Sequence, residues 1–147
     1  MRAAGSAEAA EATDGMTPRE MCVAASIAGT VGQTPLVRLN RVTKDCFAEV
    51  YAKLEFVTVG GSAKDRIAVH MIEAAEARKE IRPGENVLIE ATSGNTGVSV
   101  SMVAAAKGYK AIIVMPRKPD MMERYILCRA YGAEVQLSDP AKGYKAI

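Results

Sequence analysis

One lysine of the sequence stands where an amine could do covalent chemistry. Lys64 follows a Gly-Gly-Ser turn (residues 60–62) and opens a stretch with helical periodicity. An amine is nucleophilic when it is neutral, and burial or a nearby positive charge, such as that of Arg66, lowers its pKa. The dipole at a helix N-terminus also disfavours a cation. The residues alone leave two interpretations, a Schiff-base lysine or an ordinary solvated charge at a helix start.

A second group of polar residues lies further along, in the stretch "ATSGNTG". Its hydrogen-bonding side chains are Thr92, Ser93, Asn95 and Thr96. The stretch leads into an expected helix, whose first N–H groups are unpaired and can hold a carboxylate. Asn95 could also donate to a phenolate-like oxygen. The alternative is a Ser/Thr or Asx turn that merely caps the helix.

Regular elements that alternate along the chain must position these two loops. The sequence predicts strands at 48–56, 86–92, 109–116 and 133–138, and helices at 63–80, 98–108 and 120–132. Such alternation indicates an α/β fold with a parallel sheet and three αβα layers. The apolar strand 109–116 is expected to be covered on both faces. Because ligands bind at the carboxyl ends of parallel strands, we expect both loops to face one crevice.

The helix predicted at 63–80 shows its limits and its apolar side in the sequence. Ser62 stands three residues before Asp65, which resembles a capping box. Apolar positions recur at helical spacing and form a stripe whose far end becomes charged: Ile67, Met71, Ala74, Ala75 and Arg78. This spacing is typical of an amphipathic helix. The "RPG" stretch at 82–84 is expected to end it.

Composition excludes several classes of function. A chain of 147 residues with 24% charged residues suits one globular domain. A net charge of +2, 5% aromatic residues and no Trp argue against nucleic-acid binding. No apolar run reaches the length of a membrane span. The single histidine, His70, gives no metal-ligand cluster, so no metal is expected.

The cysteines and the N-terminal stretch bear on location. Cys22, Cys46 and Cys128 are odd in number and far apart, which indicates reduced thiols in a cytoplasmic compartment. Residues 1–26 are expected to form a disordered tail, and residues 27–147 the folded part. The first 16 residues of the tail contain one arginine against three acidic residues, which does not favour an organelle address.

Five stretches in this order resemble one known family: "GQTPLVRLN", "AKLEF…GGSAKDRI", "IEATSGNTG", "AAAKGYKAIIVMP" and "ERYILCRAYGAEVQLSDPAKG". They are similar to the cysteine synthases (O-acetylserine sulfhydrylases) and the related cystathionine β-synthases, which are fold-type II pyridoxal-phosphate enzymes. The resemblance covers about residues 28–145 and implies the tryptophan synthase β-like fold. Small departures are Ala63 and Ala91, where the family usually has Val and Pro.

The resemblance implies roles for the residues singled out above. Lys64 would bind pyridoxal phosphate covalently and later act as an acid and base. Asn95 would hydrogen-bond the cofactor's ring hydroxyl, and a loop containing Thr92, Ser93 and Thr96 would hold the substrate carboxylate. The implied reaction is β-replacement, in which O-acetylserine and sulfide give cysteine and acetate. Family members are homodimers, and cysteine synthases dock the C-terminus of serine acetyltransferase.

Family members are much longer than this chain, which we therefore expect to be an N-terminal portion of the fold. The remaining portion would carry the loop for the cofactor phosphate, and its absence would leave apolar faces and sheet edges uncovered. Three hypotheses stay open. The chain is an active cysteine synthase or cystathionine β-synthase; it is a non-catalytic homologue that binds serine acetyltransferase or full-length subunits; or it is an incomplete fragment.

Overall fold

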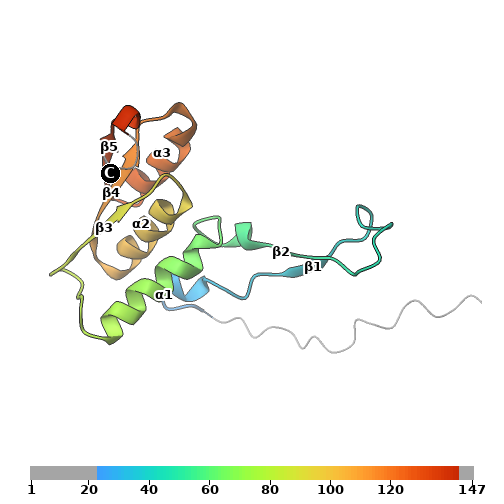
Figure 1. Ribbon diagram of the computed structural model, residues 1–147. Coiled ribbons are helices and arrows are strands. Elements are labelled where there is room, and N and C mark those ends of the chain that lie inside the picture. The colour runs from blue at the N-terminus through green and yellow to red at the C-terminus, as the bar shows by residue number, and fades with distance from the viewer. Residues whose placement is uncertain (1–22, 143–147) are drawn as a thin grey trace, which may run out of the picture.

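The structure is a computed structural model that describes residues 23–142 (Figure 1). Most of the expected tail, residues 1–22, and the last residues, 143–147, lie outside the described part. The helices are α1 (Lys64–Ala77), α2 (Asn95–Lys107) and α3 (Met122–Ala130). The strands are β1 (Leu36–Arg38), β2 (Tyr51–Lys53), β3 (Val87–Ala91), β4 (Lys110–Pro116) and β5 (Glu134–Ser138). Short 3₁₀ turns occupy Ile27–Thr30, Glu55–Val57 and Pro119–Met121.

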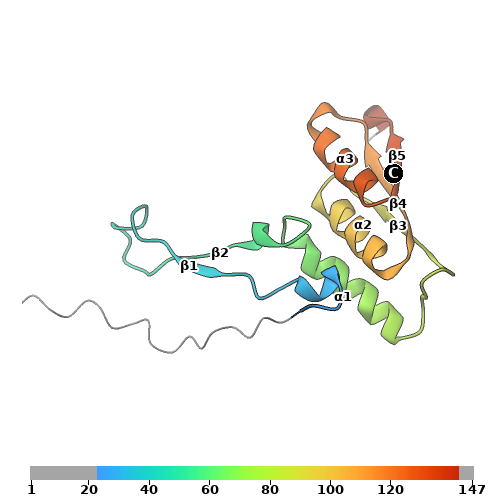
Figure 2. The ribbon, with the colours of Figure 1, turned by 180° about the vertical axis from the view of Figure 1, so that it is seen from behind.

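A parallel sheet confirms the predicted α/β class. Its strand order is β3-β4-β5, with Leu88 opposite Ala111 and Ile113 opposite Val135. Helices α2 and α3 connect these strands and lie on one face of the sheet, while α1 lies against α2 (Figures 1 and 2). Apolar side chains on the helix-facing side of β4, such as Ile113 and Met115, are fully buried because α2 covers them.

The opposite face of the sheet is less covered than the sequence indicates. On β4, Ile112 and Val114 are only half-buried, and on the neighbouring β3 Ile89 is 67% exposed. The expectation that residues 109–116 are covered on both faces is therefore wrong for the described part of the chain. Within residues 23–142 the helices supply one layer over the parallel sheet, and a layer on the other face is not among them.

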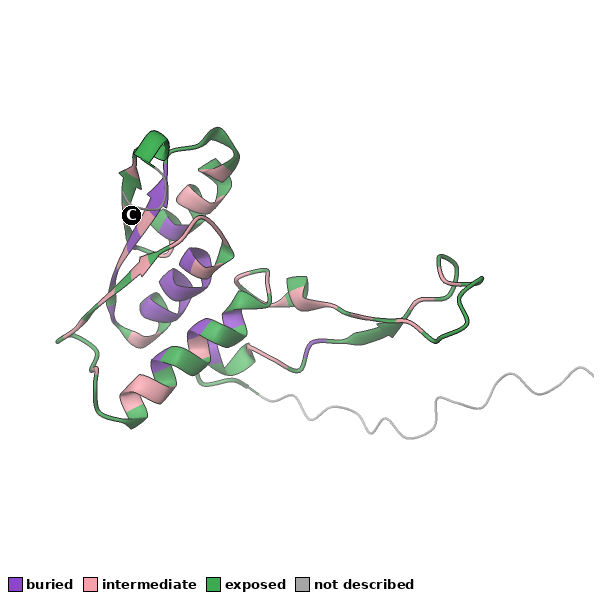
Figure 3. Ribbon diagram, in the orientation of Figure 1, coloured by how far each residue is buried: buried purple, intermediate pink, exposed green. Residues whose placement is uncertain are grey.

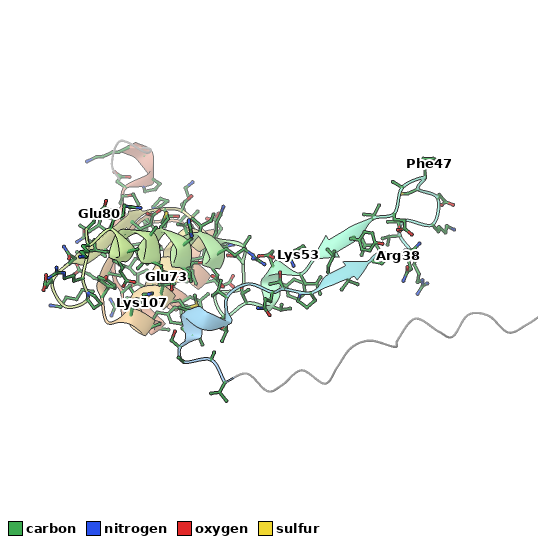
Figure 4. The ribbon with its side chains drawn as sticks, turned by 90° about the horizontal axis from the view of Figure 1, so that it is seen from below. Arg38, Phe47, Lys53, Glu73, Glu80 and Lys107 are labelled. Carbon is green, nitrogen blue, oxygen red and sulfur yellow. The ribbon has the colours of Figure 1, made fainter. Side chains whose placement is uncertain are left out.

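The strand predicted at 48–56 does not join the parallel sheet. Its central part is β2, which pairs antiparallel with β1 in a separate two-stranded sheet. Backbone hydrogen bonds from Leu39 to Val50 and from Leu54 to Pro35 extend the pairing at both ends. Segments close in sequence pair most readily, so a local hairpin forms instead of a crossover. The hairpin projects from the rest of the molecule (Figure 1), and Phe47 lies at its far end (Figure 4).

Helix α1 buries a different face from the predicted stripe. Ile67 and Met71 are 43% and 46% exposed, whereas the buried positions are Asp65, Ala68 and Ile72. Helix α1 packs against α2, and Asp65 has a hydrogen-bond partner there. The helix also ends at Ala77, well before the "RPG" stretch that was expected to end it.

Helix α2 is the centre of the core, and most of its residues are buried (Figure 3). It begins at Asn95, three residues before the predicted start, so half of the polar loop belongs to its first turn. Gly97 makes this possible: a Cβ there would lie 2.7 Å from Thr92 Cγ2 and 2.9 Å from Ile113 Cγ2. At the other end Gly108 has φ 81° and closes the helix, as its position in the sequence predicts.

Candidate functional site

Lys64 is the first residue of α1 and its side chain is exposed. The turn before it is held by hydrogen bonds within the loop. The Gly61 amide donates to the Thr58 carbonyl at 2.9 Å, and the Lys64 amide donates to Ser62 Oγ at 3.2 Å. Gly61 has φ 75°, a conformation that suits glycine. The structure thus presents the lysine at the start of a helix, after a closed glycine turn.

Asp65, the next residue, is completely buried. Its carboxylate accepts a hydrogen bond from the Gly60 amide at 2.8 Å and one from Ser99 Oγ at 2.5 Å. The capping-box prediction is therefore wrong in its pairing, because the carboxylate binds Gly60 and α2 instead of the backbone of Ser62. The sequence indicates a helix-capping role for Asp65 and does not predict its buried bond to α2. A serine on the buried side of the next helix was the signal available.

Arg66 is paired with a carboxylate. Its guanidinium donates to Glu55 at 2.8 and 3.0 Å and to Thr34 Oγ1 at 2.9 Å. Thr34 Oγ1 in turn donates to Glu55, and the hydrogen bonds from Arg66 first, and then from Thr34, lower the pKa of Glu55 to about 2. Arg66, which the sequence offers as a positive charge near Lys64, is thus ion-paired with Glu55. The network fixes the segment before the glycine turn to the first turn of α1.

The polar loop joins the end of β3 to α2. The Thr92 amide donates to the Val114 carbonyl at 2.9 Å and extends the strand pairing, while Thr92 Oγ1 accepts from the Gly94 amide at 3.1 Å. The structure thus contains the Ser/Thr turn. The same loop can also bind a ligand, because the turn uses only the side chain of Thr92. Asn95 is exposed in the first turn of α2, and Ser93 and Thr96 are half-buried beside it.

Helix α3 and the residue after it contact both loops. Arg124 Nε donates to Asn95 Oδ1 at 3.4 Å, and the Tyr131 hydroxyl donates to the Val59 carbonyl, beside the glycine turn, at 3.4 Å. Asp65, the neighbour of Lys64, also bonds to Ser99, one helical turn after Asn95, which links the starts of α1 and α2. The N-terminal ends of α1 and α2 also point to the same side of the molecule (Figures 1 and 2). Sequence reasoning missed Arg124 and Tyr131.

These groups match the chemistry of a pyridoxal-phosphate site. An exposed amine at Lys64 suits the cofactor's aldehyde. Because Asn95 Oδ1 accepts from Arg124, the amide nitrogen is left to donate to a ring oxygen. A Cβ built on Gly61 or Gly94 would meet nothing within 4 Å, so there is open space beside both loops. The residues present therefore fit the cofactor's ring end.

Two classes of site are not found in the part of the chain that the structure describes. Residues 23–142 contain no gathering of three His, Cys, Asp or Glu side chains that could hold a metal ion. None of the helices in the same range has the length and hydrophobicity needed to cross a bilayer.

A parallel sheet with a lysine loop and a polar loop, each opening a helix on the same side, defines the class as an α/β protein. The family model described as "Pyridoxal-phosphate dependent enzyme" matches residues 27–146. The chain belongs to this family, because the match covers most of it.

Relatives within the family agree with this fold. The probable cysteine synthase of Bacillus subtilis is 53% identical over 118 residues, which are 79% of this chain and 37% of that protein. The crystal structure of cysteine synthase from Entamoeba histolytica superposes with a TM-score of 0.80 at 33% identity, over 92% of this chain and 40% of that one. The crystal structure of the O-acetylserine dependent cystathionine β-synthase from Helicobacter pylori superposes with a TM-score of 0.71 at 30% identity. The match covers 86% of this chain and 41% of that one.

These matches confirm the resemblance to the cysteine synthases and the fold-type II architecture. They also show that the chain spans only about two fifths of the length of the proteins it matches. The roles of Lys64, Asn95 and the residues of the 92–96 loop are predictions.

Proposed function

We propose that this chain carries the lysine and the substrate-carboxylate loop of a cysteine synthase. The observation that supports this most directly is the pairing of α1 and α2, which sets Lys64 and Asn95 at the starts of two adjoining helices. The similarity to the Bacillus subtilis protein favours cysteine synthesis over other activities of the family. The substrates are then O-acetylserine and sulfide, and the products cysteine and acetate.

The chain's own residues would divide the work as follows. Lys64 Nζ bonds to the cofactor and later takes and returns the proton at the substrate Cα. The Asn95 amide nitrogen donates to the ring oxygen, while the first-turn amides of α2 with Thr92, Ser93 and Thr96 bind the substrate carboxylate. Pyridoxal phosphate, when bound, supplies the electron sink for charge that develops at Cα.

Covalent trapping at Lys64 tests the proposal. The purified chain is incubated with pyridoxal phosphate, reduced with borohydride and digested, and the modified peptide is identified by mass spectrometry. We expect modification at Lys64 together with an absorption band near the edge of the visible range. Both should disappear in Lys64→Ala and persist in Lys44→Ala, which removes an exposed lysine of the hairpin loop. Folded protein without modification at Lys64 would contradict the proposal.

The substrate assignment needs its own measurement. Cystathionine β-synthase activity is the alternative, because a structure similar to this chain carries that name. Cysteine formation from O-acetylserine and sulfide is compared with cystathionine formation from O-acetylserine and homocysteine. A higher rate with homocysteine would replace sulfide as the sulfur donor while leaving the site assignment intact.

Exposed apolar side chains favour a partner, and a homodimer is our first choice. Phe47 is fully exposed, and Val42 and Phe56 are 82% and 69% exposed. The alternative is a non-catalytic chain that associates with full-length cysteine synthase or with serine acetyltransferase. Sedimentation of the chain alone and pull-downs with each protein distinguish these partners. We place the protein in the cytoplasm, a reducing compartment that suits the free thiols of Cys46 and Cys128.

A further inference from the structure

Asp65 is the only carboxylate among the buried polar side chains of residues 23–142. A carboxylate costs free energy to bury unless it is hydrogen-bonded, and here the Gly60 amide and Ser99 Oγ both donate to it. An apolar pair of similar volume can stabilise a fold equally well. Stability alone therefore gives no reason for a carboxylate at this place, and its surroundings suggest another role.

Asp65 and its partner Ser99 lie close in sequence to the two proposed ligand-binding residues, Lys64 and Asn95. Asp65 follows Lys64 directly, and Ser99 stands four residues after Asn95, about one helical turn further along α2. A single buried carboxylate thus connects the first turn of α1 to the first turns of α2. The separation between the lysine and the asparagine is set across this connection.

The same carboxylate also touches the turn that precedes the lysine. Gly60 comes so close that a Cβ at this position would lie 2.1 Å from Asp65 Oδ1. Only a glycine allows the backbone amide to reach the carboxylate, and the reach fixes the entry of the chain into α1. Asp65 therefore fixes Lys64 through two contacts, one with the turn before the lysine and one with helix α2.

We propose that Asp65, bound to Ser99 and to the Gly60 amide, is a positioning residue that sets Lys64 against the Asn95 loop so that both act on one ligand. The inference rests on the proposed function, because it takes Lys64 and Asn95 as the ligand-binding groups. A reactive group displaced by about 1 Å loses up to about a hundredfold in rate, so such a link has a direct chemical effect.

Two variants break the link and one serves as a matched control. Ser99→Ala removes one donor and leaves the contact with Gly60. Asp65→Asn keeps the shape but removes the charge, so Ser99 Oγ must accept from the amide NH₂ while the Gly60 amide donates to a neutral oxygen. Ser101→Ala removes an equally buried hydroxyl from the same helix, where it donates to the Gly97 carbonyl at 2.7 Å, away from Asp65. Circular dichroism and thermal unfolding select temperatures at which each variant is folded.

Two readouts follow the position of Lys64 without relying on turnover. The first is backbone hydrogen exchange over residues 58–64 in the cofactor-free chain. The second is the rate of borohydride trapping of pyridoxal phosphate at Lys64. We expect Ser99→Ala and Asp65→Asn to speed exchange and slow trapping by about tenfold each, while Ser101→Ala stays within about twofold of the parent. If Asp65→Asn does not fold, Ser99→Ala carries the test, because it keeps the charge and the Gly60 contact.

Three outcomes overturn the inference. Exchange and trapping that match the parent in Ser99→Ala show that the link does not position the lysine. Equal effects in Ser101→Ala show that general loosening of α2 is responsible. A parent chain that is folded but not trapped at Lys64 removes the proposed function itself, and the inference with it. The parent measurement thus separates failure of the function from failure of the positioning role.

Discussion

Gly60 packs directly against the carboxylate of Asp65, the residue that follows Lys64. Gly60→Ala would place a Cβ against the Asp65 carboxylate, so the turn or the helix must move. We expect a loss of roughly 1–3 kcal/mol in the free energy of unfolding, as for other overpacked sites. Urea denaturation measures this loss.

The matched control is Gly94→Ala in the second loop. Gly94 has an extended backbone, and a Cβ there would meet nothing within 4 Å. This variant should be unchanged or more stable by up to about 1 kcal/mol, because alanine has less freedom in the unfolded chain. Equal losses at Gly60 and Gly94 would contradict the close approach to Asp65.

Glu55 provides a second prediction for a single residue, in its pH dependence. Arg66 and then Thr34 hold its pKa at about 2, below the ordinary value of 4.5. A carboxyl whose pKa is lowered on folding stabilises the fold above its unfolded value, and this contribution is lost as the pH falls through the folded value. The stability difference between the parent and Glu55→Gln should therefore be constant above about pH 5 and shrink from pH 4.5 towards pH 2. Urea midpoints between pH 7 and pH 3 measure it, and a difference that grows on acidification is the contrary result.

Helices α1 and α2 are also joined at their far ends, where Glu76 accepts from the Tyr109 hydroxyl at 2.9 Å and from Lys107 Nζ at 2.8 Å. Tyr109 is 7% exposed. The hydrogen bonds from Lys107 first, and then from Tyr109, lower the pKa of the Glu76 carboxyl. Tyr109→Phe should cost about 2 kcal/mol, because it removes a part-buried hydrogen bond to a charged group.

Another tyrosine provides the control for this helix contact. The Tyr51 hydroxyl donates to Glu49 at 2.9 Å, but on the exposed surface of the hairpin. Tyr51→Phe should change the free energy of unfolding by about 0.5 kcal/mol or less. Chemical denaturation of both variants gives the comparison, and equal losses would show that burial between α1 and α2 adds nothing.

At the scale of elements, the sequence predicts the α/β unit well because each part carries a local signal. The strands at 86–92, 109–116 and 133–138 agree with β3, β4 and β5 to within about two residues, as expected for element boundaries. The apolar run of β4 and the helix-ending Gly108 are properties of the sequence itself. Local periodicity therefore suffices to order this part of the fold.

The expectations from the sequence are wrong where a contact between distant segments determines the local structure. The pairing of β2 with β1 depends on the chain turning back on itself, which alternation of apolar residues does not show. The buried face of α1 depends on Ser99, a residue of another helix, and a carboxylate was not expected to face inward. For the site, the two loops were predicted, whereas Asp65, Arg124 and Tyr131 became visible only in three dimensions.

At the scale of the whole molecule, one face of the parallel sheet is only partly covered by the described residues. By register, Val87 and Ile89 on β3 share this face with Ile112 and Val114 on β4. Val87 and Ile89 are 46% and 67% exposed. Contiguous apolar surface of this kind favours association. We expect the chain to self-associate as its concentration rises.

Charge placed on this face should reduce the association without unfolding the chain. Ile89→Lys introduces a charge in the middle of the apolar group, whereas Gln136→Lys adds the same charge to the polar end of the same face, on β5. Sedimentation velocity over a concentration series should show weaker association for Ile89→Lys only. Equal weakening by both variants would show that net charge controls the association. No weakening by either variant would indicate that the association uses the hairpin around Phe47.

The contact between Gly60 and Asp65 also limits which substitutions can arise one at a time. An alanine at 60 is obstructed while the carboxylate is present, and a smaller residue at 65 gives up the bond to Ser99 before it makes room. Each single step is harmful whichever comes first, so the two positions form an epistatic pair. In a library randomised at both sites, survivors should keep glycine and aspartate together or lose both, with few intermediates.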